Sequence, residues 1–310
     1  MARLAKVAVC STPNSVVGED DEERHEFNLR KAEELLHEAA AQGADIACLP
    51  EAFPVRGINS GGTDDRWYEP VPGGETYQRM AAVARQHGMY VVAPVLGLDD
   101  DGLRRNVAMV IDRNGNYVGG YNKVHLTVTE IEQWGITAGD SWPVFDLDFG
   151  KIGITICYDV FFPEGYRILA LKGADIIYHP TMYSMYGEVG WEAVIHSRAI
   201  DNCVYVCPVN YGFTDHEPWM PGMCLNRSSV IGPDGITLAD RGRYWGVAMA
   251  ELDLDRPRMV YRGGTTGLAS FREDAWNHRR PDTYQELLDY GYWVDGLHEK
   301  SVEQPVETEA

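Results

Sequence analysis

The sequence has no long hydrophobic run and is poor in basic residues. No apolar stretch among its 310 residues approaches the roughly 20 that span a bilayer, and the N-terminal stretch is too short for a signal peptide. Lys and Arg number 27 against 47 Asp and Glu, which gives a formal net charge of -20. A surface this negative repels phosphate backbones and anionic lipid, so we expect neither a nucleic-acid partner nor a membrane partner. These features predict a soluble cytoplasmic protein.

The signatures of several common enzyme classes are also missing. No Gly-x-Gly-x-x-Gly opens a helix, and the glycine-rich segment 263–267 lacks the lysine of a phosphate loop. Neither Gly-x-Ser-x-Gly nor His-Glu-x-x-His occurs, and Cys203 and Cys207 have the wrong spacing for a zinc knuckle. We therefore expect no metal ion and no cofactor.

Cysteines are few, and they lie mostly in apolar, strand-like segments. The six are Cys10, Cys48, Cys157, Cys203, Cys207 and Cys224. Because the chain is long enough to bury a large core and has no signal peptide, reduced thiols are expected rather than a disulfide framework.

Short apolar segments alternate with helical patterns, as is typical of an α/β protein. Strands are predicted at 5–10 and 44–49, around a helix over 22–42, and a helix over 74–87 precedes strands near 90–97, 106–111 and 118–121. The pair Asn114-Gly115 predicts a hairpin between the last two. The second half shows the same strand–helix–strand order over 150–157, 164–172 and 174–179, with later strands near 204–209, 228–231 and 246–252.

One short sequence occurs in both halves. Gly-Ala-Asp-Ile at 43–46 recurs at 173–176, 130 residues later. This predicts two halves related by a pseudo-twofold axis, although Gly-Ala-Asp could also be only a common connection from helix to strand. No segment resembles an interdomain linker, so we predict one domain over residues 1–297. The acidic segment 298–310 is expected to be a disordered tail.

Three segments place a reactive group just past an apolar strand, where α/β folds tend to build sites. Glu51 follows the strand near 44–49, Lys123 is flanked by apolar and aromatic residues, and Cys157 leads from a strand into a turn and a helix. A helix N-terminus next to a thiol would favour its thiolate. Taken singly, each could instead be a loop carboxylate, a surface lysine or a buried thiol.

These segments together resemble the nitrilase, or carbon–nitrogen hydrolase, superfamily. Leu-Pro-Glu at 49–51, Lys-Val-His-Leu at 123–126 and Ile-Cys-Tyr-Asp at 156–159, with Phe-Pro-Glu at 162–164, match three family motifs in order and spacing. The resemblance extends from about residue 6 to residue 251 and implies a four-layer α-β-β-α sandwich that forms a homodimer or a higher homo-oligomer. It agrees with the two halves predicted above.

The resemblance implies a Glu–Lys–Cys triad. Glu51 would be the base and acid, Lys123 the electrostatic stabiliser and Cys157 the nucleophile, and the other five cysteines would be structural. The family usually has a second glutamate between the lysine and a Gly-Asp pair, here at 139–140. Glu132 fits that placement best, and Glu130 is the alternative.

The resemblance further implies hydrolysis of a non-peptide C–N bond in a small amide. Nitrilases have Trp-Glu after the nucleophile, whereas Tyr158 and Asp159 follow it here, so amidase or carbamoylase activity is favoured over nitrile hydrolysis. Acyl transfer and a non-catalytic regulatory subunit of the same fold are further alternatives. The candidate substrate-binding residues are Tyr158, Trp134 and Tyr183, and the candidate carboxylate clamps are Arg56 and Arg198.

Overall fold

The computed structural model describes residues 2–182, 188–214, 227–255, 259–261, 268–285 and 287. One sheet contains β1 (Leu4–Ser11), β2 (Ile46–Cys48), β3 (Glu69–Pro70), β4 (Tyr90–Leu98), β5 (Arg104–Ile111), β6 (Tyr117–Asn122) and β13 (Gly246–Asp253). A second sheet contains β7 (Val144–Asp146), β8 (Lys151–Ile154), β9 (Ile176–Pro180), β10 (Tyr205–Val209), β11 (Ser228–Ile231) and β12 (Thr237–Gly242). A small antiparallel pair is formed by β14 (Met259–Tyr261) and β15 (Leu268–Ser270).

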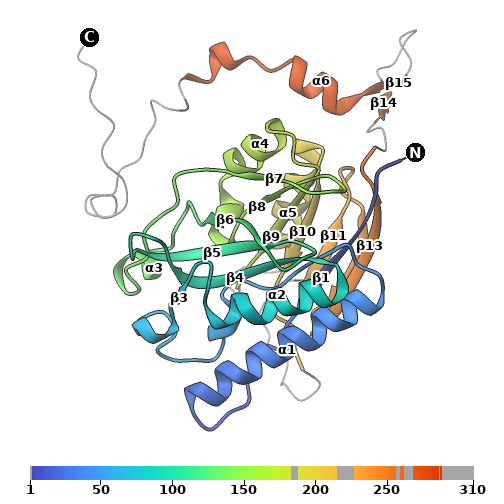
Figure 1. Ribbon diagram of the computed structural model, residues 1–310. Helices are drawn as coiled ribbons and strands as arrows, with labels where there is room; N and C mark the ends of the chain where they lie inside the picture. The colour runs from blue at the N-terminus through green and yellow to red at the C-terminus, as the bar shows by residue number, and fades with distance from the viewer. Residues whose placement is uncertain are drawn as a thin grey trace, which may run out of the picture.

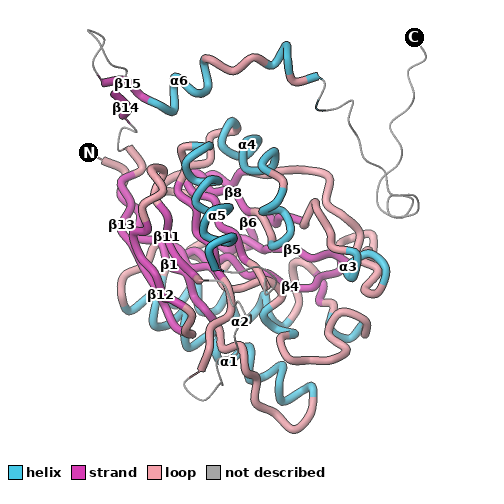
Figure 2. The backbone as a smooth tube through the Cα atoms, turned by 180° about the vertical axis from the view of Figure 1, so that it is seen from behind, coloured by secondary structure: helices cyan, strands magenta, loops and turns pink. Residues whose placement is uncertain are grey.

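The described chain contains the helices α1 (Asp21–Ala41), α2 (Glu75–His87), α3 (Val128–Glu132), α4 (Pro163–Leu171), α5 (Glu188–Asn202) and α6 (Phe271–Asn277), with the 3₁₀ turns η1 (Phe53–Val55), η2 (Asp65–Trp67), η3 (Cys157–Phe161) and η4 (Pro281–Thr283). Four helices cover the outer faces of the two sheets, α1 and α2 on the first sheet and α4 and α5 on the second. In Figure 1, α1 and α2 cross in front of the sheets, and in the reverse view of Figure 2, α4 and α5 are in front. No helix in the described part of the chain combines the length and the apolar character needed to cross a bilayer.

The strand orders are β13-β1-β2-β4-β5-β6 in the first sheet, with β3 beside β4, and β12-β11-β10-β9-β8-β7 in the second. Three layers of buried side chains hold these elements together. One layer, which includes Leu36, lies between α1, α2 and the first sheet, and another, which includes Tyr178, lies between the sheets. The third, which includes Leu169, packs α4 and α5 on the second sheet. The predicted four-layer α-β-β-α sandwich is confirmed.

Matched hydrogen bonds relate the two halves of the fold. Asp45 accepts a hydrogen bond from the backbone N–H of Lys6 at 2.9 Å, and Asp175 accepts one from the backbone N–H of Lys151 at 3.1 Å. The backbone N–H groups of the same aspartates bond back to the carbonyls of Lys6 and Lys151, both at 2.8 Å. Each aspartate therefore joins the start of one strand to its parallel neighbour, and the repeated Gly-Ala-Asp marks the same connection in both halves.

The element boundaries mostly agree with the sequence pattern. Helix α1 begins after Asp20, whose carboxylate accepts the N–H of Glu23 at 2.8 Å, and the predicted hairpin turns at Gly115, whose φ is +81°. Strand β1 pairs with β13 along its whole length, from Leu4 opposite Asp253 onward, and so ties the start of the chain to the end of the sandwich. The tail predicted for 298–310 lies outside the described residues.

Candidate active site

A lysine, a glutamate and a thiol come together where strands of both sheets end. Glu51 lies just beyond β2, Lys123 directly follows β6, and Cys157 lies beyond β8. Lys123 Nζ is 2.9 Å from Glu51 Oε1, and the charges of both side chains act on the Cys157 thiol. Because β2 and β8 belong to different sheets, the packing of the two sheets assembles this group.

Lys123 is a buried cation held by two carboxylates. Its side chain is only 1% exposed, and besides Glu51 it contacts Glu130 Oε2 at 2.8 Å and Oε1 at 2.9 Å. Burial by itself would lower the pKa of Lys123, but the charges of Glu130 and Glu51 raise it well above its ordinary value. The lysine is therefore a fixed positive charge within the site.

The glutamate beside this lysine is Glu130, so the prediction of Glu132 is wrong. Thr127 caps α3 and accepts the N–H of Glu130, while the Glu130 carboxylate turns back to the backbone N–H of Thr127 at 2.8 Å. This capping box directs Glu130 into the site, whereas Glu132 is about 200° further around the helix and exposed. Thr-x-x-Glu at 127–130 is the signal that could have identified it.

Burial would raise the pKa of the Glu130 carboxyl, but Lys123, the Thr127 backbone N–H and Asn106 together lower it below its ordinary value. Glu130 therefore stays ionised at neutral pH. Lys123 also contacts the buried Glu51 carboxyl, so one ammonium group lies between two carboxyl groups. A buried group of this kind is stable only when every oxygen has donors.

Three neighbours that sequence reasoning missed hold Glu51 in place. Asn106, on β5, donates one amide hydrogen to Glu51 Oε1 and the other to Glu130 Oε1, each at 2.8 Å. The Met182 backbone N–H donates to Glu51 Oε2 at 2.8 Å, and the Tyr211 hydroxyl donates to the Glu51 carbonyl at 2.6 Å. These residues come from three separate strands or strand ends, so no local sequence motif predicts that they contact Glu51.

Cys157 occupies a strained position beyond β8, as the first residue of η3. Its φ is +46°, a left-handed conformation that costs a non-glycine residue about 1–3 kcal/mol. Burial of the thiol raises the pKa of Cys157 to about 12, Glu51 adds to the rise, and Lys123 and the Thr181 hydroxyl act against it. The resting thiol is therefore protonated at neutral pH.

Asp159 ties the cysteine turn to the lysine segment. Its fully buried carboxylate accepts the backbone N–H of Ile156 at 2.8 Å and the hydroxyl of Tyr121 at 2.6 Å through Oδ2. Its Oδ1 accepts the backbone N–H of His125 at 3.0 Å and faces the Nδ1 of the same residue at 2.8 Å. The motifs at 123–126 and 156–159 are thus bound to each other by one carboxylate.

Comparison with known proteins agrees with this geometry. The carbon-nitrogen hydrolase family profile matches residues 6–261. The chain belongs to the carbon–nitrogen hydrolase family. A protein of Synechocystis sp. named deaminated glutathione amidase is 33% identical over 249 residues, which are 75% of this chain and 88% of that protein. A protein of Pyrococcus abyssi named nitrilase is 41% identical over 182 residues, which are 57% of this chain and 66% of that protein.

Solved structures of the family share the fold. The crystal structure of an amidase from Nesterenkonia sp. matches with a TM-score of 0.72 at 21% identity, and the match covers 91% of this chain and 96% of that one. The resemblance inferred from the three motifs is confirmed by the family assignment.

The candidate substrate-binding residues of this carbon–nitrogen hydrolase have separate environments. Tyr158 is 37% exposed next to the nucleophile, and its ring meets that of Phe162 edge-on at 5.3 Å. Trp134 packs against Gly62, so closely that a Cβ at Gly62 would lie 2.1 Å from the indole. Tyr183 lies outside the described residues.

The two candidate carboxylate clamps are both engaged within the protein. Arg198 donates from Nε and Nη2 to the Val160 carbonyl of η3, at 3.0 and 2.9 Å, and so supports the turn that carries Cys157. Arg56 bonds the side chain of Asn14 and lies over the Tyr211 ring, 4.8 Å from its centroid.

The other described cysteines, for which a structural role is predicted, lie inside the protein. Cys10, Cys48, Cys203 and Cys207 are buried and form no disulfide among the described residues. Burial raises the pKa values of the Cys10, Cys48 and Cys207 thiols above their ordinary range, which makes them poor nucleophiles. Cys224 lies outside the described residues.

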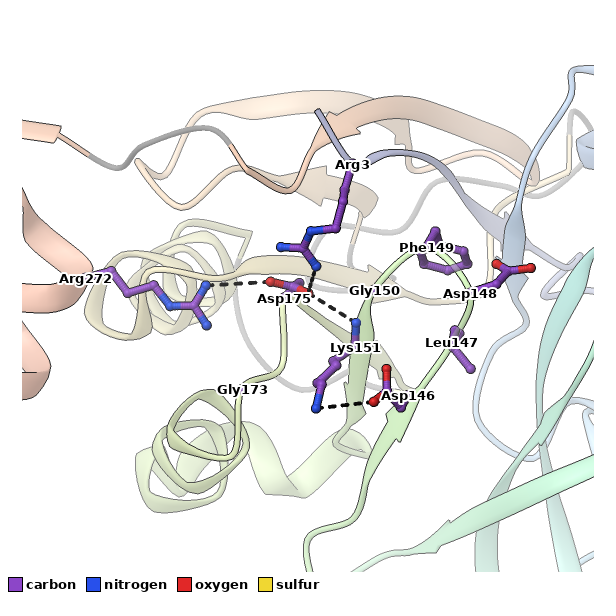
Figure 3. A pocket seen from close by; sticks show the side chains of 10 residues that line it. All are labelled: Arg3, Asp146, Leu147, Asp148, Phe149, Gly150, Lys151, Gly173, Asp175 and Arg272. Atoms are coloured by element: carbon purple, nitrogen blue, oxygen red, sulfur yellow. Dashed lines mark hydrogen bonds and ion pairs between the residues drawn. The ribbon is translucent and has the colours of Figure 1, made fainter. Parts of the chain in front are cut away.

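A cavity of about 430 Å³ lies away from this group, beside the loop between β7 and β8 (Figure 3). Its charged side chains neutralise one another: Asp175 contacts Arg3 at 3.2 Å and Arg272 at 3.7 Å, and Lys151 contacts Asp146 at 3.3 Å. No predicted site residue lines it.

Proposed function

We propose that this protein is a thiol-dependent amidohydrolase that cleaves the C–N bond of a small linear amide and releases ammonia or an amine. The observation that carries the proposal is the buried group in which Lys123 contacts Glu51 and Glu130 beside the strained Cys157. Membership of the carbon–nitrogen hydrolase family and the likeness to deaminated glutathione amidase support the same reaction.

Glu51 is the proposed base, and its hydrogen bonds indicate which oxygen acts. Oε1 already accepts from Lys123 and Asn106, whereas Oε2 accepts one hydrogen bond from the described residues, that of the Met182 N–H. Oε2 therefore keeps a lone pair for the proton of Cys157. As the proton moves to Oε2, the sulfur attacks the amide carbonyl and a C–S bond forms.

Lys123 and the backbone N–H of Tyr158 are the proposed partners of the oxyanion that develops on the carbonyl oxygen. The C–N bond then breaks as Glu51 returns the proton to the leaving nitrogen, which leaves a thioester on Cys157. Glu51 next accepts a proton from water, whose oxygen attacks the thioester carbonyl. The C–S bond then breaks, the carboxylic acid leaves, and the sulfur regains its proton from Glu51. The net reaction converts an amide and water into a carboxylic acid and ammonia or an amine.

Glu130 has a separate role in this scheme. While Glu51 carries the proton, it no longer balances the charge of Lys123, and Glu130, bound through both oxygens, keeps the lysine protonated and in place. Glu130 itself has no open position for the thiol proton, because Lys123, Asn106 and Thr127 occupy both of its oxygens. The two glutamates are therefore not interchangeable.

Other substrates define the alternatives. An N-carbamoyl amine or amino acid would react with the same catalytic groups, and so would a nitrile. Nitriles are included in the panel below because the chain is 41% identical to the Pyrococcus abyssi protein named nitrilase. Acyl transfer to an amine would differ only in what attacks the thioester. A regulatory subunit without activity is the alternative outside enzymology.

The proposal also includes a cytoplasmic location and assembly into a homodimer or a higher homo-oligomer. The described cysteines, which form no disulfide with one another, support the first, and the family resemblance supports the second. Light scattering of the purified protein measures the assembly directly, and a single-chain mass would contradict it.

The deciding experiment measures ammonia release from a panel of amides, N-carbamoyl amines and nitriles, with the C157A variant as the blank. Release that disappears in C157A supports the thiol mechanism, and the active class identifies the bond. Release that survives in C157A or K123A overturns the proposal. If the folded protein releases ammonia from no compound of the panel, the proposal is overturned and the regulatory subunit is favoured.

A further inference from the structure

Thr181 is a buried residue at the cysteine that the reaction scheme above does not use. It follows β9, and its backbone N–H donates to the Val209 carbonyl at 2.8 Å. The next residue, Met182, donates its N–H to Glu51 Oε2 at 2.8 Å, so the backbone at Thr181 runs along the site. Its side chain is 0% exposed.

The hydroxyl of Thr181 has no hydrogen-bond partner among the described residues. Buried polar groups are nearly always paired, so a buried hydroxyl left unpaired needs an explanation. The Thr181 hydroxyl acts on the Cys157 thiol, because it opposes the rise of the thiol pKa that burial causes. The hydroxyl is therefore a donor held near a sulfur that is uncharged in the resting state.

The other polar side chains around Cys157 are already committed. Lys123 is shared between two carboxylates, and both amide hydrogens of Asn106 are donated to the same pair. A thiolate formed at Cys157 would thus face two carboxylates and a lysine that they already balance. It needs a neutral donor of its own.

We propose that Thr181 is a further catalytic residue of this site, whose hydroxyl donates a hydrogen bond to Cys157 Sγ whenever the sulfur carries negative charge. That state arises twice: when Glu51 takes the thiol proton, and when the sulfur leaves the thioester. The proton stays on Thr181 Oγ1 throughout, so no other reactant is needed. The inference rests on the proposed function for its place in the reaction.

Hydrogen bonds to charged acceptors are about twice as strong as those to neutral ones. The Thr181 hydroxyl therefore gains most when the thiolate forms and little in the resting enzyme. An interaction that strengthens along the reaction raises the rate, whereas one of constant strength would not. This predicts a larger effect of Thr181 on kcat than on KM.

The test compares T181V, which keeps the branched shape and lacks the hydroxyl, with T181S, which keeps the hydroxyl. The rate constant for alkylation of Cys157 by iodoacetamide is measured from pH 6 to pH 10, and mass spectrometry confirms the labelled peptide. We expect T181V to react about tenfold more slowly near neutral pH, with its profile displaced upward by about one pH unit. T181S should stay within about threefold of the natural protein.

The inference is overturned if folded T181V gives the same alkylation profile as the natural protein. If T181V does not fold, T181A and T181S give the same comparison of a missing and a retained hydroxyl. On the active substrate, kcat of T181V should fall by about the same tenfold while KM changes by less than about twofold. An unchanged kcat would also overturn the inference.

Alkylation of Cys157 needs no substrate. The role of Thr181 and the proposed amidohydrolase function can therefore be refuted independently of each other. A slow T181V in a protein that hydrolyses nothing on the panel would refute the proposed function and still support the contact between Thr181 and the sulfur. Normal hydrolysis with an unshifted T181V would refute only the role of Thr181.

Discussion

The sharpest prediction concerns Glu130, and the chain supplies its own control in Glu132. In E130Q, one oxygen that now receives donors becomes an NH₂ group. At the Oε1 position it would face Lys123 and Asn106, and at the Oε2 position it would face Lys123 and the N–H of Thr127. In either orientation of the new amide, its NH₂ group faces other hydrogen-bond donors and can accept from none of them.

The magnitude follows from those contacts. Each hydrogen bond to a charged group contributes about 1.5–3 kcal/mol, and breaking a buried ion pair by removing one partner costs about 3–5 kcal/mol. We expect the E130Q substitution to lower the free energy of unfolding by about 3 kcal/mol. Activity should fall about 100-fold or more, since a mispositioned Lys123 no longer stabilises the oxyanion.

Glu132 is exposed, so E132Q should change the free energy of unfolding by less than about 0.5 kcal/mol and leave activity unchanged. The assays are guanidinium unfolding followed by circular dichroism, and ammonia release from the active substrate. The reasoning is refuted if E132Q is the inactive variant, or if E130Q keeps full activity.

Three further changes test the surrounding network. D159N places an NH₂ group against the N–H of either Ile156 or His125, depending on the orientation of the amide, and should lower the unfolding free energy by about 3 kcal/mol in the same unfolding assay; an unchanged midpoint would contradict this. Y211F removes the bond to the Glu51 carbonyl and should lower it by about 1 kcal/mol, with full stability as the contrary result. Burial lowers the pKa of His179 to about 3, so the folded state stays neutral there while the unfolded state takes up a proton below about pH 6.5. Stability therefore falls with pH below that value, by about 2 kcal/mol at pH 5, and H179N should reduce this loss; equal pH dependence in both proteins would show the attribution to be wrong.

Much of the architecture could be predicted because it depends on local sequence patterns, namely a repeated motif and apolar periodicity. The repeat of Gly-Ala-Asp identified the two halves, and the structure explains it through Asp45 and Asp175, which bond the neighbouring strand in the same way. Apolar periodicity located β1 and α1 to within one residue. The short α3 was not predicted, since five residues are too few to show a helical period.

The site was harder to predict from the sequence because its contacts join residues that are far apart along the chain. Glu51 and Asn106 are 55 residues apart, and Glu51 and Met182 are 131 apart. No pattern within one segment reports such pairs. Glu132 was favoured by counting residues back from a Gly-Asp pair, whereas the side chain that enters the site is decided by the cap of a single helical turn at Thr127.

The charge pattern of the cluster also explains how the resting thiol can be unreactive and the enzyme still active. Lys123 is protonated and Glu130 is ionised, and the thiol beside them has a pKa of about 12. In the proposed scheme the proton moves from Cys157 to Glu51, which leaves the net charge of the group unchanged and moves one negative charge from the carboxylate to the sulfur. The thiolate therefore needs to exist only while an amide carbonyl is in position to accept it, and the idle site is protected from oxidation and alkylation. An alkylation rate that keeps rising with pH above pH 9 is the expected signature, and a plateau near neutral pH would show that a stable thiolate is already present.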